Sequence, residues 1–455
     1  MTDWIQSSDF GGTSTAGWPA APAVETTGRM LVLTDIQPSK SGRPTAASLK
    51  RVEEALTTTV GINLAHSSEF ADDDSVAAGL LGAVEGTQGA FLDDLGIAVI
   101  ESHEDWQERL AVASAEPGGP IVEAEPERVV WALNEFVAGY QAGVNDLADA
   151  MRAHPGMAGI AVVPAWLPGG PFADDATFTW GLRATGVSAA AGTGGGARVA
   201  VLDTGVDRSH PDLAPALAAT RSFIAGEAVD DGNGHGTHCC GTVAGRRAPT
   251  SVPRFGVAPD AQLFVGKVLS NAGQGGDAGI LAGIQWAMQN NCHIVSMSLG
   301  ANVPAGTPHS RIFERTATRA LAAGTLLIAA AGNASRRPQL VAPIGHPANC
   351  PSILAVAAVD PQLAPARFSS AGRVGDAHVN ISGPGVDVLS AAPGGTHRQA
   401  SGTSMATPHV AGTAAVLQAD TQIVGAELAL RLLLGAQGLA APAVDVGAGL
   451  CSTAS

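Results

Sequence analysis

Five apolar segments in the second half of the chain constrain its fold more than any other feature. Each is four to seven residues long and has few polar side chains, so both faces of each segment must be buried. They are 197–202, 262–268, 294–297, 325–330 and 353–359. Such strands are typical of parallel sheets covered by helices, and segments 280–290 and 314–323 are suitable helices. We therefore expect a doubly wound, mostly parallel α/β sheet, with functional groups at the carboxyl ends of its strands.

The first part of the chain follows a different pattern. A flexible leader, rich in Ser, Thr, Gly, Pro and Ala, is expected over residues 1–27. Strand candidates then occupy 30–35, 96–101 and 120–124, and helix candidates occupy 46–60 and 104–114. This order predicts a small two-layer α+β domain of the split βαβ, ferredoxin-like kind over residues 28–133. Residues 134–172 should contain a helix (134–153) and a Pro/Gly-rich connector (155–171), which lead to a second domain over 173–455.

Charge and cysteine content exclude several classes of function. The formal net charge of −16 opposes binding to phosphate backbones, so we expect no nucleic-acid partner. No apolar run approaches membrane-spanning length, and no membrane contact is expected. Residues 1–20 lack the basic and apolar regions of a secretory signal, and the five cysteines lack metal-ligand spacing. We expect a cytoplasmic location with reduced thiols, or export without a classical signal.

Three short segments supply residue types that nucleophilic catalysis needs together. Asp203 follows the first apolar strand, His235 lies between glycines at a helix start, and Ser404 begins another helix. A serine hydroxyl becomes an effective nucleophile when an imidazole accepts its proton. The imidazole in turn needs a buried carboxylate that fixes its tautomer. Backbone N–H groups at a helix start can stabilise the developing oxyanion, so these three residues are our candidate catalytic groups.

The surrounding segments resemble the active-site signatures of the subtilisin-like serine proteases. They are VAVLDTGVD (199–207), DGNGHGTHCCGTVAG (231–245) and SGTSMATPHVAG (401–412), in the order Asp, His, Ser that is known for subtilisin. The resemblance covers about residues 180–450. It implies a serine endopeptidase that works through an acyl-enzyme, with Asp203, His235 and Ser404 as its triad. The segment AAAGN (329–333) resembles the family's oxyanion-hole segment, which implies that the Asn333 amide donates to the oxyanion, as its counterpart in subtilisin does.

Further segments resemble the family's substrate-binding elements. NAGQGG (271–276) is similar to the edge strand that pairs with substrate, SMSLG (296–300) to one side of the S1 pocket, and IGHPANCPS (344–352) to the pocket floor. The implied substrate-binding residues are Gly273, Gln274, Gly275, Ser298, Leu299, Gly300 and Gly345. A glycine floor favours a large apolar P1 side chain. Asp277 stands where many relatives have an aromatic S4 wall, so we expect either a basic preference at P4 or a solvated carboxylate.

Two departures from the family pattern concern metals and thiols. Residues 246–254 lack the oxygen-bearing side chains of the family's tight calcium site, and Asp212 matches only one of its ligands. We expect that no cofactor is required, with a weak structural calcium site left open. Cys239 matches a thiol beneath the catalytic histidine of some relatives, and we expect a packed small side chain rather than a nucleophile.

Residues 96–133 resemble the second half of the family's inhibitory prodomain. This implies a self-processed zymogen that acts on polypeptide substrates, with its own N-terminal domain as an intramolecular inhibitor. An unrelated α+β accessory domain is the alternative. The primary cut is predicted within 128–144, with trimming in 155–171, and nothing in the sequence requires more than a monomer.

Two rival functions come from other classes. A peptide-binding pseudoprotease would be favoured by loss of a triad residue or of Asn333, and all four are present. An esterase would need a GxSxG elbow, whereas Ser404 lies in GTSMA.

Overall fold

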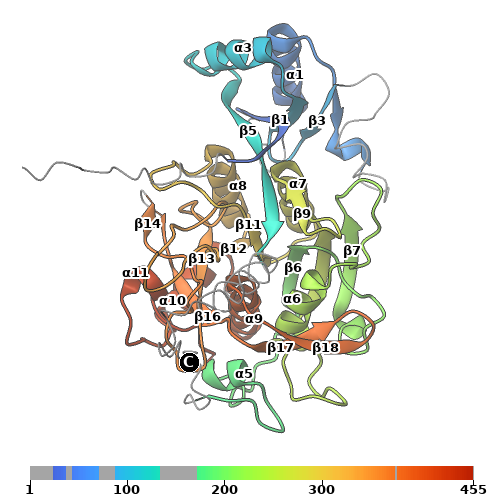
Figure 1. The fold of residues 1–455 in the computed structure, drawn as a ribbon. Helices are drawn as coiled ribbons and strands as arrows, with labels where there is room; N and C mark the ends of the chain where they lie inside the picture. The colour runs from blue at the N-terminus through green and yellow to red at the C-terminus, as the bar shows by residue number, and fades with distance from the viewer. Residues whose placement is uncertain (1–23, 37–43, 71–87, 134–171, 375–376, 454–455) are drawn as a thin grey trace, which may run out of the picture.

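A computed structural model describes residues 24–36, 44–70, 88–133, 172–374 and 377–453 (Figure 1). The predicted leader up to residue 23, the predicted helix 134–153 and the connector up to residue 171 lie outside these ranges. The described chain forms two seven-stranded sheets, one parallel and one mainly antiparallel, and two two-stranded sheets.

The parallel sheet contains all five predicted strands. They are β6 (Arg198–Asp203), β8 (Gln262–Lys267), β10 (Ile294–Met297), β12 (Leu326–Ala330) and β13 (Leu354–Val359). β7 (Leu217–Ser222) and β16 (Ile381–Pro384) complete the order β16-β13-β12-β10-β6-β8-β7, in which every neighbouring pair is parallel. These two edge strands were not predicted because neither has a continuous apolar sequence. β7 is half-exposed, and β16 contains Gly and Pro.

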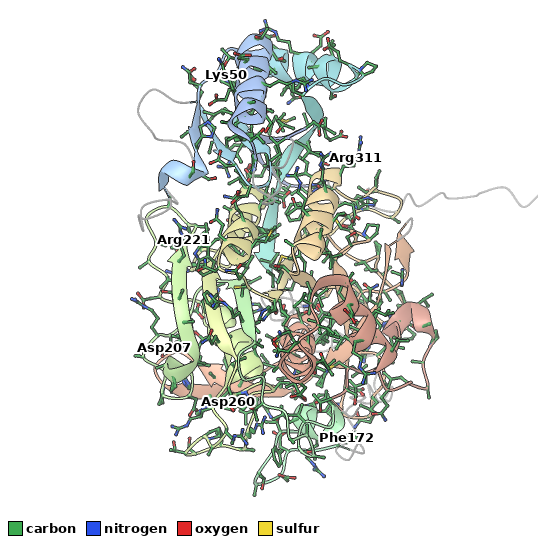
Figure 2. All side chains as sticks on the ribbon, turned by 180° about the vertical axis from the view of Figure 1, so that it is seen from behind. Lys50, Phe172, Asp207, Arg221, Asp260 and Arg311 are labelled. Carbon is green, nitrogen blue, oxygen red and sulfur yellow. The ribbon has the colours of Figure 1, made fainter. Side chains whose placement is uncertain are left out.

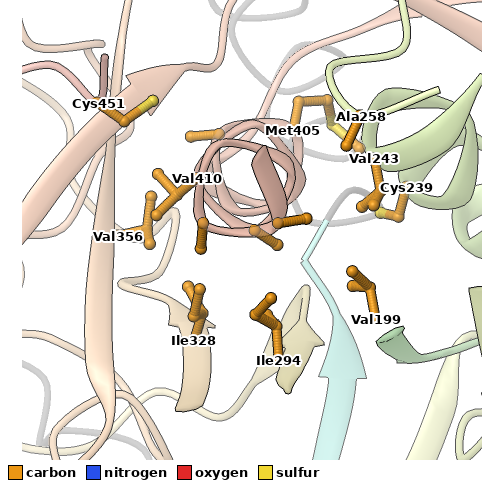
Figure 3. Packing of buried hydrophobic residues seen from close by; sticks show 14 of the residues in the cluster. Val199, Cys239, Val243, Ala258, Ile294, Ile328, Val356, Met405, Val410 and Cys451 are labelled. Atoms are coloured by element: carbon orange, nitrogen blue, oxygen red, sulfur yellow. The ribbon is translucent and has the colours of Figure 1, made fainter. Parts of the chain in front are cut away.

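Helices cover both faces of this sheet, as predicted for a doubly wound fold. Alternate side chains of β6 point to opposite faces, so Ala200 and Leu202 join one apolar cluster while Val199 and Val201 join the other. The first cluster contains side chains of α7 (Asp277–Gln289) and α8 (Arg311–Ala322). The second contains side chains of the helices α6 (His235–Ala244), α9 (Thr403–Thr421) and α10 (Gly425–Leu434). Figure 3 shows sheet residues of the second cluster facing Val410 on α9.

Smaller elements complete this part of the chain. They are α5 (Trp180–Ala184), the 3-10 turn η2 (Ala214–Ala216), the hairpin of β17 (Val388–Ala392) and β18 (Thr396–Ala400), the pair β14 (Arg373–Val374) and β15 (Ala377–His378), and α11 (Ala443–Val446). No helix within the described ranges has the length and apolar character needed to cross a membrane.

The other seven-stranded sheet, antiparallel except for the pair β2–β3, lies mainly in a first unit, which we define as residues 24–133. Its elements in order are β1 (Thr26–Thr34), α1 (Ala46–Val60), β2 (Leu64–His66), the 3-10 turn η1 (Ser67–Phe70), β3 (Gly89–Leu92), β4 (Ile97–Glu101), α3 (Glu104–Ser114) and β5 (Ile121–Ala132). β1 lies between β5 and β4 and is antiparallel to both, and β1 begins inside the predicted leader. α1 and α3 have the predicted bounds, and α1 is capped by Thr45 and by Gly61 at φ 75°.

Strand β5 connects the two parts of the molecule. Beyond its pairing with β1, it pairs antiparallel with β9 (Gln274–Gly276) and with β11 (Leu299–Gly300). In Figure 1 it extends from the first unit into the body below. The predicted strand ended at residue 124, because residues 125–132 include Pro126 and charged side chains and find their partners only in distant segments.

Candidate active site

Asp203 and His235 form a buried hydrogen-bonded pair. Asp203 is the last residue of β6, and His235 is the first residue of α6, whose N-cap is Gly234. A strand of the parallel sheet and a helix packed on that sheet therefore bring the two side chains together. Their Oδ1 and Nδ1 atoms are 2.7 Å apart, and both side chains are fully buried. The carboxylate accepts from Nδ1, which leaves Nε2 as the proton acceptor. Among the described residues Nε2 has no hydrogen-bond partner, so it is free to take a proton from a nucleophile.

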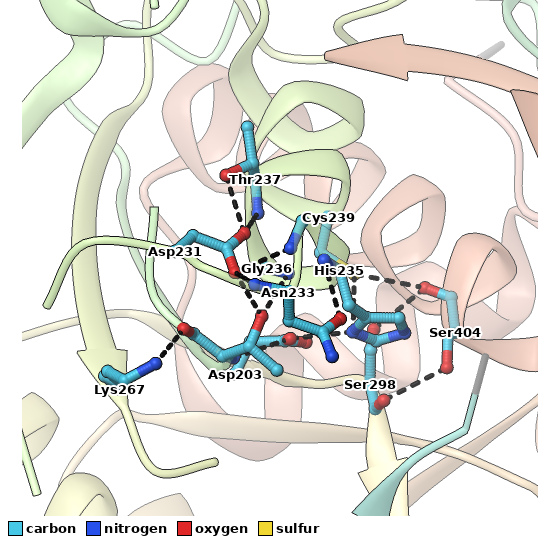
Figure 4. A network of polar contacts seen from close by, with 12 residues as sticks. Asp203, Asp231, Asn233, His235, Gly236, Thr237, Cys239, Lys267, Ser298 and Ser404 are labelled. Atoms are coloured by element: carbon cyan, nitrogen blue, oxygen red, sulfur yellow. Dashed lines mark hydrogen bonds and ion pairs between the residues drawn. The ribbon is translucent and has the colours of Figure 1, made fainter. Parts of the chain in front are cut away.

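Ser404 lies in the first turn of α9, on the other side of the His235 ring (Figure 4). Its Oγ donates to the Ser298 carbonyl at 3.0 Å, and the Ser298 hydroxyl donates to the Ser404 carbonyl at 2.8 Å. The Cys239 thiol lies beneath both catalytic candidates, 3.9 Å from His235 Nδ1 and 3.7 Å from the Ser404 carbonyl. Burial raises the pKa of Cys239 well above its usual value, so this thiol stays protonated and packed, as expected.

A polar network around Asp231 fixes the Asp203–His235 pair. Asp231 Oδ2 accepts from the main-chain N–H and the hydroxyl of Thr237 in α6, at 2.8 and 2.7 Å. Its Oδ1 accepts from the Thr204 hydroxyl at 2.9 Å, and the Thr204 N–H donates to Asp203 Oδ1 at 2.7 Å. The buried Lys267 ammonium donates to the Thr204 carbonyl at 2.6 Å. The sequence motifs did not predict a role for Asp231, Thr204, Thr237 or Lys267. An acidic residue four positions before His235 and a lysine at the end of an apolar strand were the signals that could have found two of them.

Asn333 presents its amide N–H₂ group to the cleft. Its Oδ1 accepts from the N–H and the hydroxyl of Thr403, each at 2.9 Å, so Nδ2 is left to donate. Nδ2 donates to the Leu133 carbonyl at 2.8 Å. Since Thr403 directly precedes Ser404, the same contacts place this donor beside the serine. A carbonyl bound there is polarised next to the nucleophile, which is the arrangement that acyl transfer requires.

The end of β5 lies in the cleft as a third strand between β9 and β11. Ala132 donates its N–H to the Gly273 carbonyl at 2.7 Å. Trp131 pairs with Gln274 and Gly300, Val130 with Gly275, and Ala132 with Leu299. Five of the proposed substrate-binding residues thus contact one extended segment that ends at the Leu133 carbonyl. The segment is flanked on both edges by the two strands that pair with it, and the Trp131 side chain stays exposed.

Two glycines allow the close approach of main chains around Leu133. A Cβ on Gly300 would lie 2.6 Å from the His346 carbonyl oxygen and 3.9 Å from Leu133 Cδ1. A Cβ on Gly345 would lie 2.7 Å from the Ala301 carbonyl oxygen. Gly300 therefore adjoins the Leu133 side chain directly, while Gly345 keeps the loop before His346 packed against the end of β11.

Asp277 is buried and has polar partners on two sides. It is fully buried at the start of α7, so the prediction of a solvated carboxylate is wrong. Its Oδ1 is 2.8 Å from His346 Nε2, and its Oδ2 accepts from the Arg128 N–H at 3.1 Å. The Arg128 guanidinium also lies 3.6 Å from Oδ2. The carboxylate thus contacts the residue five positions before Leu133.

Two glutamates of β5 bind the starts of two helices. Glu127 is fully buried, and its Oε1 accepts from the Ala278 N–H of α7 at 2.9 Å. Glu125 Oε1 accepts from the Arg311 N–H of α8 at 2.8 Å. Helix N-termini carry partial positive charge and unpaired N–H groups, so carboxylates are favourable there.

Two groups of residues in the described ranges have the donor types of a metal site. One is Asp203, His235 and Cys239, which the candidate site already uses. The other is His210, Asp212 and His397. Asp212 accepts from His397 Nε2 at 2.8 Å and lies 3.8 Å from Arg246 Nε, so this carboxylate already has two protein partners. Both nitrogens of His210 also have partners, at Asp212 N and the Thr396 carbonyl.

Comparisons with known proteins match the part of the chain that holds this site. The model of the subtilase family matches residues 194–438. A thermostable alkaline protease from Halalkalibacterium halodurans is 44% identical over 246 residues, which cover 53% of this chain and 63% of that protein. Subtilisin DY from Bacillus licheniformis is 41% identical over 237 residues, covering 52% and 81%. Subtilisin E from Bacillus subtilis is 41% identical over 227 residues, covering 50% and 56%. The chain therefore spans less than two thirds of two of these three relatives.

Proposed function

Because the chain belongs to the subtilase family, we propose that it is a serine endopeptidase with Asp203, His235 and Ser404 as its catalytic triad. The observation that carries this proposal is the Leu133 carbonyl, held by the Asn333 amide beside Ser404. A peptide carbonyl in that position is ready for attack by a hydroxyl group. The rival function, a peptide-binding pseudoprotease, has no contact or comparison in its favour.

The proposed chemistry follows from the proton positions at the site. Ser404 Oγ turns from the Ser298 carbonyl to the substrate carbonyl carbon, and His235 Nε2 takes its proton. Asp203 holds Nδ1–H and stabilises the imidazolium that results. Asn333 Nδ2 and the N–H groups at the start of α9 stabilise the oxyanion. The imidazolium then protonates the leaving amine, and water hydrolyses the acyl-enzyme by the reverse sequence of proton transfers.

We further propose that the first unit is an inhibitory prodomain. Its strands β5-β1-β4-β3 follow the order expected of a split βαβ, ferredoxin-like domain, to which the short strand β2 is added beside β3. Its last strand lies between β9 and β11, which supports this proposal. Leu133 then takes the P1 position, and the Leu133–Asn134 bond is the primary processing site. That bond lies within the predicted range 128–144.

The same strand suggests which polypeptides the enzyme cleaves. Leu133 and Val130 are buried, which favours apolar side chains at P1 and P4. Arg128 lies beside buried Asp277, which favours a basic side chain at P6 rather than at the expected P4. The proposed hydrolysis of such polypeptides uses only protein side chains, main-chain N–H groups and water, so it requires no metal or organic cofactor.

Expression of the full chain and of its Ser404→Ala variant tests the function. Wild-type protein should release a fragment that ends at Leu133 and should hydrolyse peptides after leucine. Ser404→Ala should stay intact and inactive, because its cleft retains the tail without a nucleophile. Mass spectrometry identifies the fragment ends. Peptide hydrolysis by purified Ser404→Ala would contradict the triad, whereas an intact and active wild-type chain would contradict only the prodomain.

A further inference from the structure

Three arginines form a row along α8 at the junction with the first unit. Arg311, Arg315 and Arg319 are four residues apart, so they share one face of the helix. Arg311 pairs with Glu123, and Arg315 Nη2 lies 3.2 Å from Asp35 Oδ1. Arg319 Nη1 donates to the Leu95 carbonyl. Figure 2 shows Arg311 where α8 meets the first unit.

Most of the net negative charge of the protein belongs to the sequence of the first unit. Residues 28–133 contain 18 acidic and 7 basic side chains, whereas residues 172–455 contain 17 of each kind. The arginine row is therefore a positive surface on an electrically balanced domain, and it meets a strongly acidic partner. Such complementarity favours recognition of acidic segments.

The first unit leaves part of this surface unfilled. A cavity of about 480 Å³ lies beside the row, with Leu33 and Val122 of the first unit on one side. Side chains of His309, Arg311, Arg315 and Arg319 also line it. The first unit thus fits the arginine surface incompletely, which leaves room for other acidic side chains.

Strand β5 also determines which of its residues contact the start of α8. Glu125 lies eight residues before Leu133 and binds the N–H groups of Arg311 and Ile312, at 2.8 and 3.4 Å. Glu123 lies ten residues before Leu133 and pairs with the Arg311 side chain. If the cut follows Leu133, these glutamates are the ninth and eleventh residues before the scissile bond.

We propose that Arg311 and the first turn of α8 form an exosite for acidic residues of polypeptide substrates. The exosite selects acidic side chains at the ninth and eleventh positions before the scissile bond, once the first unit has left. It rests on the proposed function, because the register is counted from Leu133. Its ligand is an extended acidic segment that continues into the cleft between β9 and β11.

Three fluorogenic peptides test the exosite on full-length protein that has processed itself. The first has the sequence of residues 119–137, the second has Gln in place of Glu123 and Glu125, and the third contains only residues 128–137. We expect kcat/KM for the acidic peptide to exceed that for its Gln form about tenfold at low salt, equivalent to about 1.4 kcal/mol. At 1 M salt, where charges are screened within about 3 Å, the two values should converge.

A pair of variants locates the effect. Arg311→Gln should lower the ratio between the acidic and Gln peptides severalfold, because it removes the side-chain partner of the eleventh residue and keeps the main-chain N–H groups that bind the ninth. Arg431→Gln, an exposed arginine on α10, should keep the ratio of the wild type. Active-site titration corrects for incomplete processing of either variant.

The outcomes separate the exosite from the function on which it rests. Equal cleavage of the acidic and Gln peptides by wild-type protein would overturn the exosite while leaving the peptidase intact. Failure to cleave the short peptide after leucine would overturn the proposed function and the exosite together. A tenfold ratio that Arg431→Gln abolishes and Arg311→Gln keeps would place the acidic site elsewhere and refute the proposal.

Discussion

Asp231 illustrates how a residue outside the catalytic candidates governs their geometry. It joins the loop after β6 to the first turn of α6, and each carboxylate oxygen accepts from a different segment. Because neither Asp203 nor His235 contacts Asp231 through its own side chain, loss of these bonds should move the pair without removing it.

We expect Asp231→Asn to lower kcat about 10- to 100-fold with little change in KM, since small misplacement of reacting groups costs that much. One of the two oxygens becomes an NH₂ group, which cannot accept from Thr204 or Thr237. Steady-state kinetics on a short peptide measure the split between kcat and KM. Asp230→Asn, which affects only an exposed pair with Arg208, is the control and should behave like the wild type. A selective rise in KM would show that Asp231 acts on substrate binding instead.

At the scale of the elements, apolar patterning was sufficient to predict the central strands of the parallel sheet. It was not sufficient to predict the strand that pairs with β9 and β11. The five central strands were predictable because their side chains are buried on both faces. The end of β5 was not, because its pairing depends on β9 and β11, which lie far along the chain. Likewise the triad candidates were visible in local motifs, whereas the roles of Asp231 and Lys267 arise from loops that meet only in the fold.

A substitution in β11 tests whether this strand shapes the site where the Leu133 side chain lies. In Gly300→Ala the new methyl group would lie 2.6 Å from the His346 carbonyl oxygen, so β11 or the loop at His346 must shift. We expect kcat/KM for peptides with leucine at P1 to fall about tenfold or more, by analogy with other small displacements at reacting sites. Peptide kinetics measure the loss. Gly195→Ala, whose Cβ would have only one neighbour, at 3.9 Å, should show no loss. Unchanged kinetics in Gly300→Ala would show that β11 does not shape the pocket.

At the scale of the whole molecule, one histidine with two carboxylate partners lies next to the contact between the first unit and α7. His66 lies between Asp93 and Glu53, and the hydrogen bond to Asp93 is the main cause that raises the pKa of His66 to about 9. Ser67, which also binds Asp93, accepts from Gln285 of α7 at 3.0 Å. The charge state of His66 therefore bears on how firmly the two parts hold together.

Because the folded pKa of His66 lies above its unfolded value of 6.5, its stabilisation is fully present below pH 6.5. That stabilisation should be lost as the pH rises through about 9. Urea unfolding of the intact Ser404→Ala protein should show this decline between pH 6.5 and pH 9.5. His66→Gln should flatten the decline, whereas His103→Gln, at an exposed position of the same unit, should keep it. An equally steep decline in His66→Gln would assign the effect to other groups.

Because β5 belongs to the first unit and also pairs with β9 and β11, cleavage after Leu133 should change how inhibition depends on protein concentration. Before that event the tail is tethered, at an effective concentration in the millimolar range or above, whatever the volume of the sample. Afterwards occupancy of the cleft obeys mass action between two separate species. The specific activity of a freshly cleaved preparation should therefore rise on dilution, because the first unit dissociates. A concentrated stock would stay inhibited until it is diluted into a larger volume.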